Sequence, residues 1–157
     1  MQYVLLGVVV VGLAVAIAQT SLRRRRTAAL RGEAKGQVIA FQIRLDRVKV
    51  MGSGWTDLKG EMVLIVRADT FEVSAATPLL GIIFGMDYYF RAPDTTIEVS
   101  ESPSFLKKGS WIVVRGKQGT SRTELAITSE NHLYDAWAAL VRAGAVPIGS
   151  PPPIPST

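Results

Sequence analysis

The side chains that could carry acid–base, nucleophilic or metal chemistry are few and scattered. His132 is the only histidine, and no partners at ligand spacing accompany it, so the sequence predicts no metal site. The chain has no cysteine, which excludes thiolate ligands, cysteine nucleophiles and disulfides. The carboxylates that could pair in space are dispersed over Asp57, Glu61, Asp87, Asp94, Glu98, Glu101 and Glu124. The sequence therefore predicts no catalytic residue and no cofactor.

Glycine-rich motifs that bind phosphates are also incomplete. Gly52-Ser53-Gly54 has two glycines of a dinucleotide-binding fingerprint, but it lacks the full spacing and a following helix. The sequence contains no P-loop and no nucleophile elbow. We therefore expect no small-molecule substrate, and the protein is predicted not to be an enzyme.

Basic charge is concentrated in one short segment. Six basic residues stand there against Glu33 alone: Arg23, Arg24, Arg25, Arg26, Arg31 and Lys35. Their net charge of +5 equals that of the whole chain, because the other 12 basic and 12 acidic residues cancel. A nucleic-acid-binding domain needs a basic face of its own, so nucleic acid is not an expected partner. The cluster is interpreted as a membrane-topology signal that could also contact anionic lipid headgroups.

The N-terminus predicts a membrane anchor. Residues 1–18 carry no charged side chain, and as a helix they would span about 27 Å, close to a hydrocarbon core of about 30 Å. We expect a single transmembrane helix over 1–22 and a basic connector over 23–36. Because an arginine-rich flank stays in the cytoplasm, the N-terminus would lie outside the inner membrane and the domain inside the cytoplasm. A cleaved signal peptide ending at Ala16-Ile17-Ala18 and a buried core helix are the alternatives.

Residues 37–145 predict a mainly β domain. Phe41, Ile43 and Leu45 alternate with polar residues, and Val48 continues the pattern after a slip of one, which indicates a β-bulge. Further strands are expected in a hairpin over 61–75 and at 87–91, 95–100, 111–115 and 124–128. About seven short strands with close turns favour a bent antiparallel barrel or sandwich.

One C-terminal helix is expected to cap this barrel. Leu133, Trp137, Leu140 and Val141 recur at helical spacing, so they predict an apolar face with Trp137 largely buried in the core. Ser129 or Asn131 could cap the start, and Gly144 stands where a helix commonly ends. Residues 146–157 form a proline-rich tail.

The run ELAITSENHLYDAWAALVRAG, residues 124–144, leads from a last strand directly into a helix with Trp137 at the centre of one face. It resembles the C-terminal end of a pleckstrin-homology-like domain of the kind found in membrane-tethered bacterial proteins. The resemblance implies that the helix plugs one end of a bent barrel and that Trp137 is structural. The clustered bases with which that family binds inositol lipids are missing, because the turn at 67–70 has one base and one acid. Inositol-lipid binding is therefore not inferred.

The apolar segment at 79–86 has no polar side chain. We expect a buried strand or bend there. Alternatively, it forms an exposed loop in which Ile82, Ile83 and Phe84 contact a membrane or a partner.

The sequence as a whole favours a non-enzymatic, membrane-tethered module that binds a protein partner at the cytoplasmic membrane face. One alternative is a peripheral lipid-headgroup sensor that uses the basic cluster. Another is a hydrolase whose carboxylates assemble only in the folded chain.

Overall fold

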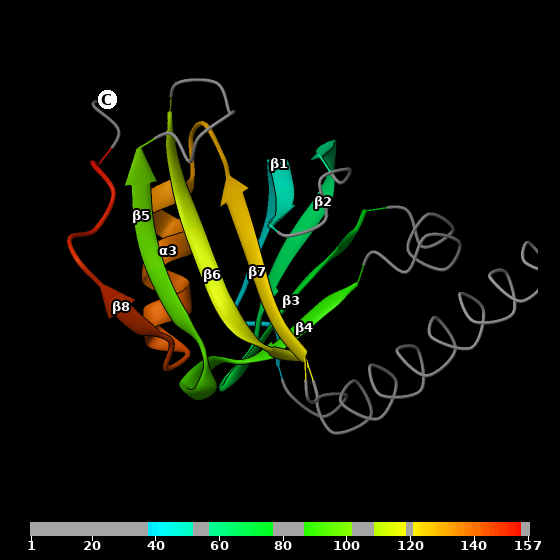
Figure 1. The fold of residues 1–157 in the computed structure, drawn as a ribbon, viewed down its shortest axis with the longest axis vertical. Helices are drawn as coiled ribbons and strands as arrows, with labels where there is room; N and C mark the ends of the chain where they lie inside the picture. Colours follow the sequence, from blue (N-terminus) through cyan, green and yellow to red (C-terminus); the bar gives the residue numbers. More distant parts are fainter. Residues whose placement is uncertain (1–37, 52–56, 77–86, 102–108, 119–120, 155–157) are drawn as a thin grey trace, which may run out of the picture.

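One eight-stranded sheet and one α-helix form the part of the chain that the structure describes. The computed structural model describes residues 38–51, 57–76, 87–101, 109–118 and 121–154. The sheet has the strand order β4-β3-β2-β1-β7-β6-β5-β8 (Figure 1). The elements in chain order are β1 (Phe41–Met51), β2 (Asp57–Val66), β3 (Thr70–Ala75), β4 (Tyr88–Arg91), the 3-10 turn η1 (Ala92–Asp94), β5 (Thr96–Glu101), β6 (Ser110–Gln118), β7 (Ser121–Thr128), α3 (Leu133–Arg142) and β8 (Val146–Ile148).

The long strand β1 joins the two halves of the sheet. It pairs antiparallel with β2 on one side and, from Arg47 onward, with β7 on the other. Its register with β2 shifts between Leu45 and Arg47. The bulge that the slipped alternation predicted is therefore confirmed, and it brings Val48 to the core face already occupied by Leu45.

The predicted bent barrel or sandwich of about seven strands is wrong, because the sheet is open and has eight strands. It is also mixed, since β8 runs parallel to β5. The backbone N–H of Val146 donates to the carbonyl of Thr95 at 2.9 Å. Residues of a parallel strand alternate between facing the neighbour and facing away, so the nitrogen of Pro147 points outward and needs no partner. The β8 strand lies beyond the domain boundary expected at residue 145.

The predicted transmembrane helix, and with it the single-pass membrane protein, is also corrected. Within the described residues, no helix has the length and apolar character needed to cross a bilayer. The helix α3 has 10 residues and is about 15 Å long, half of a typical hydrocarbon core. The segments expected as anchor and connector, 1–22 and 23–36, lie outside the described residues.

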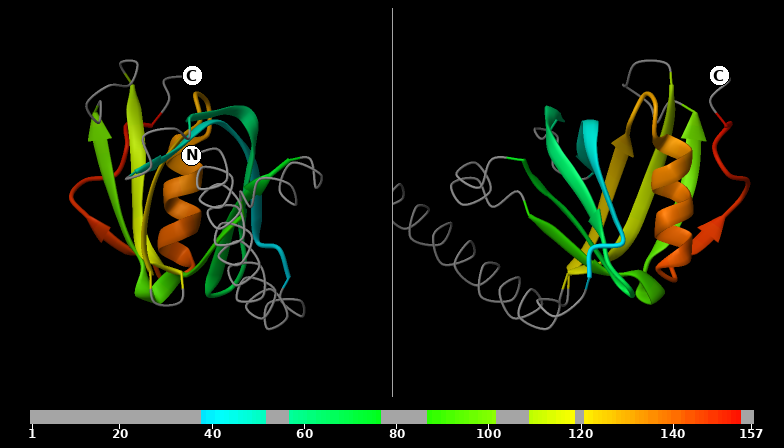
Figure 2. Two further views of the ribbon diagram at one scale, coloured as in Figure 1. Left: turned by 45° about the vertical axis from the view of Figure 1, so that its right-hand side comes forward. Right: turned by 180° about the vertical axis from the view of Figure 1, so that it is seen from behind.

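The sheet curves so that its inner face and α3 enclose the core (Figure 2). Strands from both halves contribute to one apolar cluster, for example through Phe71 on β3 and Ile112 on β6. Within one half, Phe71 stacks on Phe90 of β4 with ring centroids 5.0 Å apart. A second, smaller cluster of Trp111, Val113 and Ala126 lies on the opposite face of β6 and β7, because these residues alternate with core residues along their strands.

The two halves of the sheet also meet through Gly116 on β6. A Cβ atom at this position would lie 2.5 Å from Cδ1 of Phe90 and 2.9 Å from the hydroxyl of Thr95. Phe90 is fully buried, so its ring has little room to retreat. Only glycine allows β6 to approach the Phe90 ring this closely.

The helix α3 ends as its sequence predicts. Gly144 follows the last helical residues with φ +103°, a conformation that favours glycine. Its N–H donates to the carbonyl of Val141, and the N–H of Ala145 donates to the carbonyl of Leu140. These two hydrogen bonds turn the chain back toward β5, beside which it forms β8. At the other end the cap position is His132 rather than the expected Ser129 or Asn131, and it makes no side-chain capping hydrogen bond.

Candidate functional site

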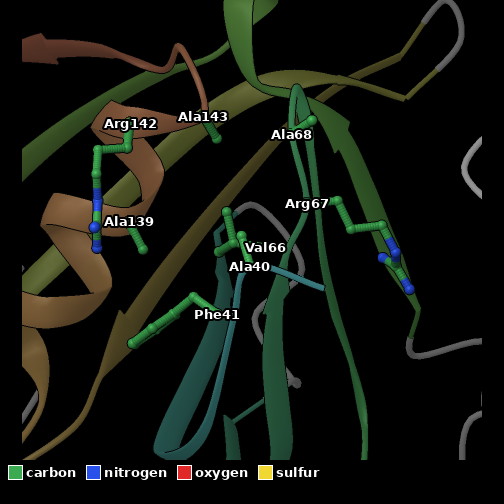
Figure 3. Close-up of a pocket in the computed structure, with 8 residues that line it drawn as sticks. All are labelled: Ala40, Phe41, Val66, Arg67, Ala68, Ala139, Arg142 and Ala143. Carbon is green, nitrogen blue, oxygen red and sulfur yellow. The ribbon is translucent and has the colours of Figure 1, made fainter. Parts of the chain in front are cut away.

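An open apolar cleft lies at one end of the fold, between the start of β1 and the last turn of α3 (Figure 3). Its volume is about 190 Å³. The residues that line this end cleft are Ala40, Phe41, Val66, Arg67, Ala68, Ala139, Arg142 and Ala143. Four of the eight are alanines, so short side chains on the helix and on the strand ends leave the space open.

Three elements converge to form the end cleft. The N–H of Ala40 donates to the carbonyl of Val66 at 2.9 Å, which ties the start of β1 to the end of β2. The following tight turn is closed by a hydrogen bond from Arg67 N–H to the carbonyl of Thr70, which places Ala68 at the rim. Ala139 and Ala143 are buried on the face of α3 that looks toward this corner.

Two exposed apolar residues precede the lining of the end cleft. Val38 is 84% exposed and Ile39 is 49% exposed. Because side chains alternate along an extended chain, Ile39 belongs to the same face as the lining residue Phe41. Ile39 is therefore an exposed apolar residue directly before the lining residues Ala40 and Phe41.

Charge at the end cleft is basic. The guanidinium of Arg67 points away from the cleft, and its Nη1 lies 3.6 Å from a carboxylate oxygen of Glu72 (Figure 3). Glu72 is buried, so this pair is largely shielded from solvent. Arg142 lies along the helix side of the cleft and is exposed, and its Nε donates to the carbonyl of Ala138 at 3.4 Å.

The carboxylates that the hydrolase alternative would require are arranged around a cation. Glu98 on β5 and Glu124 on β7 both contact Arg115, which lies between them on β6. Its Nη1 lies 2.5 Å from Glu98 Oε2, and its Nε lies 3.2 Å from Glu124 Oε1. The hydrogen bond to Glu98, followed by the charges of both glutamates, raises the pKa of Arg115. Both carboxylates thus pair with the same cation, an arrangement that suits a structural ion-pair network.

The single histidine lies at the start of α3 and is exposed. Its Nδ1 is 3.5 Å from Asp135 Oδ2, one helical turn away. Among the described residues, no three histidine, aspartate or glutamate side chains gather closely enough to hold a metal ion.

The structure places the expected helix residues in two environments. Leu133 and Leu140 are buried in the core, whereas Trp137 and Val141 are half-buried and pack against its margin. Trp137 also stacks on Tyr134, with ring centroids 6.4 Å apart. The centre of the buried face is formed by Ala136 and Ala139, because small residues let the helix lie close to the sheet.

The other predicted site residues lie outside the described residues. This holds for the basic cluster (Arg23, Arg24, Arg25, Arg26, Arg31 and Lys35) and for Ile82, Ile83 and Phe84. Their roles stay predictions, as does lipid-headgroup sensing.

Sequence reasoning missed the end cleft altogether. Alanine gives no sign in a sequence that it borders a cavity rather than a packed core. The available signal was the pair Val38-Ile39, two apolar residues ahead of a strand whose own alternation begins at Phe41.

Comparison with known proteins identifies no relative. The resemblance to pleckstrin-homology-like domains therefore stays a prediction. No family model matches the chain, and neither a curated protein nor a solved structure is significantly similar to it.

Proposed function

We propose that this chain is a non-enzymatic protein-interaction module, and that its end cleft receives an apolar side chain from a partner polypeptide. The observation that carries the proposal is the open apolar cleft, together with the exposed apolar side chains of Val38 and Ile39, which directly precede its lining residue Ala40 in the chain. Apolar surface left in contact with water is unfavourable, by about 25 cal/mol per Å², and burial against a partner removes that cost.

The size of the end cleft favours a side chain over a metabolite. Sites for small molecules usually enclose about 300–1,000 Å³, whereas this cleft has about 190 Å³. Its walls are alanine, valine and phenylalanine, with the polar groups at the margin. Such a space suits one aliphatic or aromatic side chain anchoring a longer segment that lies across the surface, as anchor residues do in protein interfaces.

The hydrolase alternative gains no support from the described residues. A carboxylate pair that acts as acid and base needs two different protonation states. Glu98 and Glu124 instead both form ion pairs with Arg115, whose guanidinium occupies the space between the two carboxylates.

Site-specific photocrosslinking in the producing cells tests the proposal. A photoreactive amino acid replaces Ala68, at the exposed rim of the end cleft, or Arg122, which is exposed on the β6–β7 hairpin. We expect a discrete adduct with another polypeptide from position 68 and none from position 122. Equal adduct yields at both positions, or none at position 68, would contradict the proposal.

A matched pair of substitutions identifies the surface that forms the adduct. Ile39 and Ile148 are similarly exposed, at 49% and 45%, but only Ile39 directly precedes a lining residue of the cleft, Ala40. Ile39→Asp should abolish the adduct from position 68, because it places a charge on the apolar contact surface. Ile148→Asp should leave the adduct unchanged.

A further inference from the structure

The geometry points to a polypeptide segment in which an acidic residue flanks the anchoring apolar residue as the occupant of the end cleft. This inference rests on the proposed function and specifies the chemistry of the partner. The apolar side chain enters the cleft, and the neighbouring carboxylate binds the guanidinium of Arg142.

Charge complementarity is the reason for the acidic residue. The eight residues that line the cleft include two arginines and no acid. Arg67 has its own counter-ion in Glu72, so its charge is largely balanced. Within the described residues, Arg142 forms no ion pair with a carboxylate, which makes it the unbalanced cation at the cleft.

The described acids next to lining residues in the chain, or paired with them, are already engaged. Glu72 pairs with Arg67, and Asp69, next to the rim residue Ala68, has interactions of its own. On α3 itself, the acid Asp135 faces His132 at the opposite end of the helix. Among the described residues none of these three acids pairs with Arg142, so its guanidinium is open to a carboxylate of a partner.

Arg142 also has donors to spare. Its hydrogen bond to the carbonyl of Ala138 uses the Nε group alone and is typical of an arginine in the last turn of a helix. A guanidinium carries five N–H donors, and the four on its Nη atoms can hold a carboxylate through two parallel hydrogen bonds. A lysine would lack this planar fork.

The experiment is an NMR titration of the full chain with three synthetic peptides. The first is Gly-Gly-Asp-Leu-Asp-Gly-Gly, the second has lysine in place of both aspartates, and the third has glycine in place of leucine. The methyl signals of Ala68, Ala139 and Ala143 report on the end cleft. We expect the aspartate peptide to shift them with at least about threefold higher affinity than the lysine peptide, the effect of one exposed ion pair. The peptide without leucine should not shift them.

A charge reversal tests Arg142 directly. Arg142→Glu should invert the preference, so that the lysine peptide binds more tightly. Arg122→Glu should change nothing, because Arg122 lies on the β6–β7 hairpin and does not line the cleft. Both arginines are exposed, so both variants should fold. Arg142→Gln removes the charge without reversing it, so it controls for damage to the end of the helix. This variant should bind both charged peptides equally.

The outcomes separate this inference from the proposed function. Equal binding of the aspartate and lysine peptides, or an unchanged preference in Arg142→Glu, overturns the acidic partner and leaves the apolar cleft in place. No shift with any peptide, combined with a cleft-specific adduct from position 68, also overturns only the inference. No shift and no adduct overturn both.

Discussion

At the scale of single residues, the Gly116 backbone fixes how closely the two halves of the sheet approach. The neighbouring ring of Phe90 is fully buried and stacks on Phe71, so it is held from both sides. An added methyl group would have to displace this ring or the hydroxyl of Thr95, which itself donates to the carbonyl of Arg91 at 2.8 Å. A small change at Gly116 therefore reaches β4 and η1.

Gly116→Ala should lower the free energy of unfolding by about 1–3 kcal/mol, the usual cost of overpacking a core. Chemical denaturation monitored by circular dichroism measures this change. Phe90→Leu supplies the control, because a smaller side chain leaves room for the methyl group. In the double variant the two losses should be clearly less than additive, and full additivity would mean that the Phe90 ring is not what Gly116 accommodates.

The charge of Arg115 contributes to stability through two ion pairs on the surface, with Glu98 and Glu124. Its pKa is raised, so the stability from its two ion pairs is present at ordinary pH and is lost only as the pH rises through that raised value. Arg115→Gln should cost about 1 kcal/mol or less per pair, equally at pH 7 and pH 10. The loss should shrink at 1 M salt, because salt screens exposed charges. Thermal melts at these two pH values and at low and high salt measure it; a loss that disappears at pH 10 would contradict the expectation.

At the scale of elements, α3 contributes to the core through one narrow face. Leu133, Ala136, Ala139 and Leu140 are buried on it, and the larger Trp137 lies at its margin. The sequence predicts an apolar helix face correctly, but not its centre. From the sequence, the large aromatic residue is expected at the centre of the buried face. Close packing of the helix on the sheet instead favours alanine at that place.

Leu140→Ala should destabilise the fold by about 2–5 kcal/mol, through lost burial and an unfilled cavity. Arg142→Ala, on the exposed side of the same helix, should cost less than about 1 kcal/mol. Trp137→Ala should fall between them, because part of its ring is already in contact with water. Urea titrations of the three variants give the order, and a Trp137 loss exceeding that of Leu140 would place the tryptophan at the centre of the packing.

At the scale of the whole molecule, local patterns in the sequence predicted local structure. The alternation along β1, the hairpin of β2 and β3, the strands β6 and β7 and the glycine that ends α3 were all predicted. Each depends on residues close together in the chain.

What could not be predicted depends on contacts between distant segments. The open sheet depends on the pairing of β1 with both β2 and β7. It also depends on the close packing of Phe90 against Gly116, which are far apart in the chain. The strand β8 has three residues, one of them proline, which is too short for a periodic signal. The end cleft needs β1, β2 and α3 to converge, and the alanines that leave it open look like ordinary helix and strand residues.

The outward-facing nitrogen of Pro147 has a consequence for crowded solutions. A sheet grows into fibrils when a strand of another molecule hydrogen-bonds to an unpaired edge. At the β8 edge, the amide that would donate to such a strand is missing at the middle of three residues. The opposite edge, β4, offers only four residues. Both outer strands of the described sheet are therefore poor templates, which protects the folded protein against polymerisation through its edges even at high concentration.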